Sequence, residues 1–112
     1  MKTEVKGMTR RRNDILQKVV TLTCDEFAIG HDDIIKRSRA IIYSTPRIVA
    51  ISILRDVFKF PHQMLADYFG YRDHSSVTRA DLDRFVKKDP YIADSVSYIL
   101  QQIKPLILNH EN

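Results

Sequence analysis

The chain has 112 residues, the size of one domain, and its 18 Lys+Arg and 14 Asp+Glu give a formal net charge of +4. A hydrophobic fraction of 44% argues against global disorder, and only three Gly and four Pro argue against a turn-rich all-β fold. No apolar run approaches the roughly 18 residues of a membrane span. A single cysteine, Cys24, allows no internal disulfide. These features predict a cytoplasmic protein with no membrane association.

Residues 1–12 are polar and basic, and no apolar segment follows them, so they are not expected to be a secretory signal. We expect residues 1–12 to form a basic flexible tail that either stays solvated or touches DNA phosphates. The expected folded domain spans residues 13–108, and residues 109–112 form a second tail.

Apolar residues at three- and four-residue steps predict a first helix from Asn13, with Gly30 in the left-handed conformation just past its end. A short helix follows at about 32–37, and residues 38–45 are expected to form a connector. Pro46 suits the first turn of the most apolar helix, predicted at about 46–58.

Pro61 is expected to open a fourth helix that Gly70 stops, and Asp73 to cap a fifth that runs to about Lys88. The last helix begins at Pro90 and is limited or kinked by Pro105. No segment alternates polar and apolar residues for long enough to predict a strand. The prediction is one all-α domain of about six helices.

No pattern in the chain predicts an enzyme. His74 lies beside Asp73 and two serines, but a catalytic serine needs a base and an oxyanion site in a strained elbow or cleft. Adjacent residues such as His31 and Asp32 point in different directions on a helix, so they favour capping over metal binding. No Gly-rich phosphate loop is present, and 112 residues leave little room for a nucleotide-hydrolysing domain. We therefore expect no catalytic residue, no metal and no cofactor.

The segment 61–77 has the pattern of a helix, a tight turn and a second helix with a polar front, which is typical of a helix-turn-helix. Ala66 is small where the helices approach, and Gly70 permits the turn. A two-helix corner in any helical bundle would have the same pattern. Recognition helices contact bases mainly through their N-terminal residues. The side chains here that can read base edges in the major groove are Arg72, Asp73, His74, Ser75, Ser76 and Arg79.

Residues 70–77 read Gly-Tyr-Arg-Asp-His-Ser-Ser-Val, which closely resembles the Gly-Gly-Arg-Asp-His-Thr-Thr-Val signature of the C-terminal DNA-binding domain of DnaA, the bacterial replication initiator. Lys36-Arg37-Ser38-Arg39 resembles the basic loop of that domain, and Pro46-Arg47 resembles the start of its central helix. The similarity covers roughly residues 17–88. It implies a Trp-repressor-like helix-turn-helix architecture and binding to double-stranded DNA.

The resemblance also implies roles for individual residues. Arg39 occupies the position of an arginine that enters the minor groove of an A·T-rich box, and residues 72–76 occupy the positions of the major-groove readers. The implied phosphate contacts come from Lys36, Arg37, Arg47, Arg55 and the first turn after Pro61 with His62. The expected complex is a monomer on an asymmetric box.

Several positions depart from the family pattern. Serines replace the two threonines, and so lose methyl groups that can touch a thymine methyl. Thr78 stands at a typically apolar position, and Asp81 and Asp83 would add negative charge to the expected recognition helix. The mode of binding is therefore expected to transfer better than the exact target sequence.

Three functions remain open. The first is sequence-specific binding at DnaA-box-like sites in the nucleoid, with an effect on replication initiation or transcription. The second is a protein-interaction module that binds the initiator or its regulator as a decoy, which Asp81, Asp83 and the loss of the threonine pair motivate. The third is a small repressor of Trp-repressor shape, which would need a dimer and a palindromic site.

Overall fold

The computed structural model describes residues 5, 7–35 and 40–110. This part of the chain contains seven helices and no strand, as the sequence predicts for an all-α domain. The number exceeds the expected six because one predicted helix is two in the structure. The helices are α1 (Arg10–Phe27), α2 (His31–Ile34), α3 (Ile41–Asp56), α4 (His62–Phe69), α5 (Ser75–Arg79), α6 (Leu82–Lys88) and α7 (Pro90–His110).

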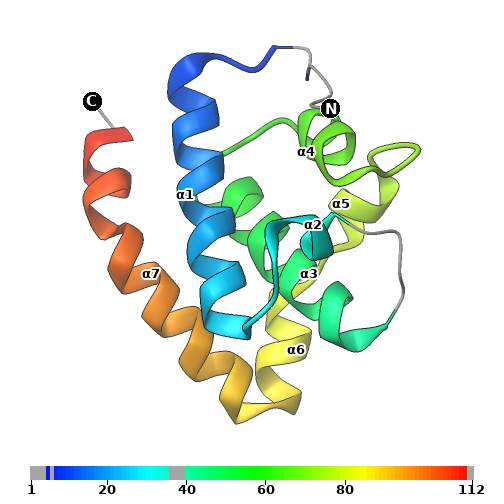
Figure 1. The fold of residues 1–112 in the computed structure, drawn as a ribbon, viewed down its shortest axis with the longest axis vertical. Helices are drawn as coiled ribbons and strands as arrows, with labels where there is room; N and C mark the ends of the chain where they lie inside the picture. The colour runs from blue at the N-terminus through cyan, green and yellow to red at the C-terminus, as the bar shows by residue number, and fades with distance from the viewer. Residues whose placement is uncertain (1–4, 6, 36–39, 111–112) are drawn as a thin grey trace.

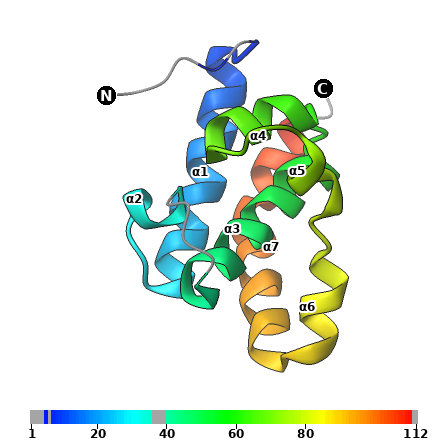
Figure 2. The ribbon, with the colours of Figure 1, turned by 90° about the vertical axis from the view of Figure 1, so that its right-hand side faces the viewer.

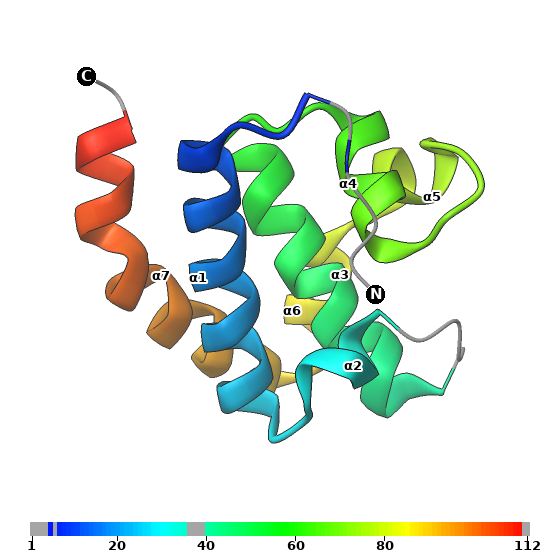
Figure 3. The ribbon, with the colours of Figure 1, turned by 45° about the horizontal axis from the view of Figure 1, so that its top comes forward.

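The two longest helices, α1 and α7, lie side by side and antiparallel, and α3 packs on the other side of α1 (Figure 1). Figure 3 shows α7, α1 and α3 in sequence across the molecule, with α4 and α5 beyond α3. This order leaves α4 and α5 on the side of the molecule away from α7. The fully buried side chains of the three central helices include Leu16, Val19, Val20, Val49, Leu54, Ile99 and Ile103.

The first helix differs from the prediction at both ends. It begins at Arg10, because the Thr9 side chain accepts a hydrogen bond from the backbone N–H of Arg12 at 3.1 Å and so caps it. At the other end the left-handed residue is Ala28 (φ 55°), and Gly30 instead precedes α2 with φ −84°. The helix closes early because the amide of Ile29 donates to the carbonyl of Cys24 at 3.0 Å, and this brings Ile29 against the core.

Replacing Ala28 by glycine should therefore stabilise the protein. Alanine is strained in the left-handed region, and glycine removes that strain. The strain removed exceeds the cost of the greater conformational entropy of glycine in the unfolded chain, so the free energy of unfolding should rise by roughly 0.5–1 kcal/mol. Urea denaturation measures the difference. The control is Ala93→Gly inside α7, where the same change should lower stability by about 1 kcal/mol. A loss of stability in Ala28→Gly would contradict the left-handed cap.

The central helix begins at Ile41, five residues before the predicted start, and contains Pro46. The Ala40 carbonyl accepts hydrogen bonds from Tyr43 and Ser44 at 3.0 and 2.9 Å, so a helical turn forms ahead of the proline. Pro46 has no backbone N–H, so the carbonyl of Ile42 lacks its helical donor. Ile42 is exposed, so water can hydrate that carbonyl. The expected connector 38–45 is thus partly helix.

Cys24 is a buried core residue, 2% exposed. Burial, followed by the charges of Asp25 and Asp33, raises the pKa of its thiol to about 11. The thiol is therefore protonated at neutral pH, and the thiolate is the reactive form. We expect a thiol reagent at pH 7.5 to modify Cys24 slowly in the native protein and rapidly in denaturant. Equal rates in both states would contradict its burial.

Candidate nucleic-acid interface

Helix α4, a turn and helix α5 form the predicted helix-turn-helix (Figure 2). Helix α4 buries Met64, Leu65 and Phe69, and it ends at Gly70, whose φ of 81° favours glycine. The amide of Tyr71 then donates to the carbonyl of Ala66 at 2.8 Å and closes the turn. Val77 is fully buried, so α5 has one side held to the core and the other exposed.

The structure brings the six predicted base readers together on the turn and on α5. Five of these side chains are exposed, and Ser75 is half-buried. The exposed five are Arg72, Asp73, His74, Ser76 and Arg79.

Asp73 also has a structural role at the start of α5. Its Oδ1 accepts a hydrogen bond from the backbone N–H of Ser75 at 2.8 Å. Hydrogen bonds from the backbone and side chain of Ser75 lower the pKa of Asp73 below its usual value, so the carboxylate stays ionised. A carboxylate in this place satisfies a free N–H of the first helical turn. Asp73, one of the predicted base readers, therefore also holds the first turn of α5.

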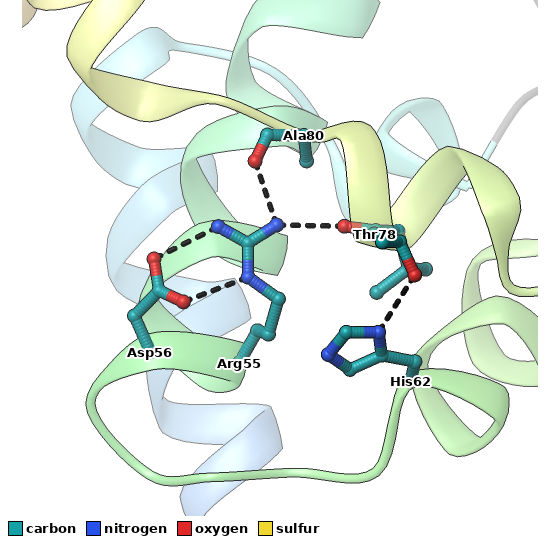
Figure 4. A network of polar contacts seen from close by, with 6 residues as sticks. Arg55, Asp56, His62, Thr78 and Ala80 are labelled. Atoms are coloured by element: carbon teal, nitrogen blue, oxygen red, sulfur yellow. Dashed lines mark hydrogen bonds and ion pairs between the residues drawn. The ribbon is translucent and has the colours of Figure 1, made fainter.

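His62 lies at the first turn of α4 and faces α5. Its Nδ1 is 2.7 Å from Oγ1 of Thr78, and the same hydroxyl is 3.5 Å from Nδ1 of His74 (Figure 4 shows the shorter contact). Thr78 thus links the two helices of the motif. The sequence marked Thr78 only as a departure from the family pattern, and no local signal indicated this contact.

The predicted helix from Asp73 to Lys88 is not continuous. Helix α5 ends at Arg79, because Ala80 has an extended ψ of 118°, and α6 begins at Leu82. Asp81 lies in the break, and its Oδ1 is 3.4 Å from the backbone N–H of Arg84, in the position of a cap for α6. Asp81 and Asp83 therefore belong to the break and to α6, and they do not add charge to the recognition helix.

Arg55, an expected phosphate contact on α3, points at the end of α5 (Figure 4). Its Nη1 donates to the carbonyls of Val77 and Ala80 at 2.7 and 2.6 Å. Its Nε and Nη2 donate to the two carboxylate oxygens of Asp56 at 2.7 and 2.8 Å. These bonds raise the pKa of Arg55 and lower that of Asp56. The side chain of Arg55 is only 14% exposed.

The remaining expected phosphate contacts differ in how the structure places them. Arg47 is 5% exposed, and its Nε donates to the carbonyl of Ile34 at 2.8 Å, so this guanidinium ties α3 to α2. Lys36, Arg37 and Arg39 lie outside the described residues. The carbonyl oxygen of Ile35 would lie 3.9 Å from a Cβ added at Gly70, so Ile35 lies near the turn. In the sequence, the basic segment 36–39 follows directly on Ile35.

No helix in the described part of the chain has the length and apolar character needed to cross a membrane. Residues 5, 7–35 and 40–110 contain no group of three or more His, Cys, Asp or Glu side chains that could hold a metal ion.

Comparison with known proteins identifies the family. The family described as bacterial DnaA protein helix-turn-helix matches residues 16–81. Among individual proteins, the chromosomal replication initiator protein DnaA of Pelobacter propionicus is 32% identical over 104 residues, which cover 88% of this chain and 22% of that protein. The Treponema denticola initiator of the same name is 25% identical over 97% of this chain and 23% of its own length.

The chain thus spans about a fifth of the length of these relatives. No solved structure matches it. The matched residues include all of α4 and α5 and the turn between them. The chain belongs to the bacterial DnaA helix-turn-helix family.

Proposed function

We propose that the protein binds double-stranded DNA sequence-specifically, with α5 and the preceding turn in the major groove. The observation that carries this proposal is the convergence of five exposed polar side chains on the turn and second helix of a helix-turn-helix of the DnaA family. Arginine pairs well with guanine, aspartate accepts from the cytosine amino group, and serine and histidine suit several base edges. The base readers in this proposal are Arg72, Asp73, His74, Ser75, Ser76 and Arg79.

A second contact, in the minor groove, is part of the proposal. The nearness of the Ile35 carbonyl to Gly70 supports it, because the basic segment 36–39 follows directly on Ile35 in the sequence. In this arrangement Arg39 enters a narrow minor groove, whose negative potential attracts an arginine. Lys36 and Arg37 contact phosphates, which position the protein without reading sequence.

The target we propose is a DnaA-box-like site, bound by one molecule, because the relatives are chromosomal replication initiators and the signature residues 72–74 are kept. Ser75 and Ser76 lack the threonine methyl groups, so the preferred box should depend less on thymine at the positions they face. Occupancy of such boxes would affect replication initiation or transcription.

Selection from a pool of random duplexes tests this function. We expect enrichment of one asymmetric box, and binding to it that falls steeply with salt because phosphate contacts release counterions. Enrichment of a palindrome, with two molecules per duplex in sedimentation, would favour the dimeric repressor. Equal recovery of all sequences would contradict specific binding.

The decoy function has lost one of its two motivations, the acids at 81 and 83, while the loss of the threonine pair remains. Asp81 caps α6, and Asp83 lies on α6 rather than on α5. Neither acid therefore opposes DNA on the recognition helix. An Arg72→Ala/His74→Ala double variant separates the two functions: DNA binding should be lost, whereas capture of an initiator through another face would persist.

A further inference from the structure

The recognition helix of this protein is short, and one side chain from the central helix holds its C-terminal end. Helix α5 has five residues, Ser75–Arg79, and the chain leaves the helical conformation at Ala80. A helix of this length has few internal hydrogen bonds, so its ends must be held by groups from elsewhere.

Arg55 supplies this support at the C-terminal end of α5. The carbonyls of Val77 and Ala80 both accept from its Nη1, at 2.7 and 2.6 Å. In a continuous helix the carbonyl of Ala80 would accept from the amide of Arg84, but that amide faces Asp81 across the break. The guanidinium therefore binds a carbonyl that the break leaves without its helical partner.

Asp56 holds the guanidinium in this place. Both carboxylate oxygens accept from Arg55, on the edge of the guanidinium that does not face α5. This paired geometry fixes the plane of the guanidinium. With four hydrogen bonds made inside the protein and 14% of the side chain exposed, Arg55 is poorly placed to reach a DNA phosphate.

We infer that Arg55 and Asp56 are positioning residues for sequence readout: they fix the end and the orientation of α5 against α3, and neither contacts DNA. This inference rests on the proposed function, because its consequence is the alignment of residues 72–79 with the base edges. It replaces the phosphate contact that the family resemblance implies for Arg55.

Asp56→Asn gives the sharpest test, because net charge and positioning predict opposite changes in affinity for the selected box. Loss of a negative charge should by itself tighten binding to a polyanion. Loss of the fixed guanidinium should instead weaken binding to the selected box by roughly three- to tenfold, with random duplex bound as well as before or better. Titrations of both duplexes at one salt concentration measure the ratio.

Asp67→Asn is the matched control. Asp67 is an exposed aspartate on α4 that accepts from Gln63 of its own helix at 2.9 Å, so the substitution removes the same charge without touching α5. It should leave the preference for the box unchanged. If Asp56→Asn binds the box as tightly as Asp67→Asn does, the inference is wrong.

The salt dependence of Arg55→Gln separates positioning from phosphate contact. Loss of a phosphate contact lowers the slope of log K against log salt by about 0.9, whereas loss of a positioning residue leaves it unchanged. Arg84→Gln, an exposed arginine on α6, provides the same charge change as a control. A slope reduced by about 0.9 relative to Arg84→Gln would overturn the inference.

A measurement on the free protein makes this inference independent of the DNA target. In Asp56→Asn, the amides of Thr78 and Ala80, which donate within α5, should exchange with solvent faster than in the wild type. The amide of Val20 in α1 should keep its exchange rate. Unchanged exchange at Thr78 and Ala80 would refute the support of α5 by this pair. If amide exchange in α5 becomes faster in Asp56→Asn but the wild-type protein prefers no box over random duplex, the proposed function fails. The structural support of α5 by Arg55 and Asp56 then still stands.

Discussion

Arg72→Ala should reduce the preference of the protein for its selected box over random duplex by about 5- to 150-fold. This range corresponds to the 1–3 kcal/mol that a good bidentate contact between arginine and guanine contributes to discrimination. Arg72 lies exposed in the turn before α5, where the helix-turn-helix presents its reading end. Competition titrations with labelled box and unlabelled random duplex measure the effect.

The control for this prediction is Arg84→Ala. Arg84 is also an exposed arginine, but it lies on α6, beyond the break that ends the recognition helix. Its removal should change binding to both duplexes by a similar small factor. An Arg72→Ala protein that weakens box and random duplex equally would show that Arg72 binds phosphate and does not read sequence.

Phe69→Ala should destabilise the fold by roughly 3–5 kcal/mol, a large part of the 5–15 kcal/mol that holds a domain of this size together. Phe69 is 2% exposed at the end of α4 and packs edge-on against Tyr68, with ring centroids 5.0 Å apart. Its removal leaves a cavity beneath the turn that carries the reading residues. The midpoint of urea denaturation reports the loss.

Tyr91→Ala provides the matched control, since it removes an aromatic ring that is 82% exposed on α7. This substitution should change the free energy of unfolding by less than about 0.5 kcal/mol. A loss below about 1 kcal/mol in Phe69→Ala would mean that α4 is not packed as the structure shows.

The elements that the sequence predicted well are those set by local chemistry. Helix α4 lies between Pro61 and Gly70 because proline is tolerated at a helix start and glycine at a left-handed end. The three- and four-residue spacing of apolar residues that predicted the first helix marks the buried face of α1, since a helix against a core repeats its apolar residues at these steps. Five of the six predicted base readers are exposed, as the polar front of the motif predicts.

Two predicted boundaries were wrong, one at the end of α1 and one at the start of α3. Ala28 rather than Gly30 is left-handed, because the position of Ile29 against the core decides where α1 closes. Pro46 lies within a helix, because the turn ahead of it is completed by Ala40. Helix propensity alone does not account for the packing of Ile29 or for the stability of the turn before Pro46.

The sequence by itself determined the all-α class, the helix-turn-helix and the residues that face outward on it, because spacing, capping and glycine conformation are local properties. Only the tertiary structure decided the roles of Arg47 and Arg55. Both are arginines on α3 that the resemblance assigned to phosphates, yet their guanidinium groups donate to the carbonyls of α2 and α5. A buried carbonyl needs a donor, and which charged side chain meets that need depends on how the helices pack, not on the order of residues along the chain.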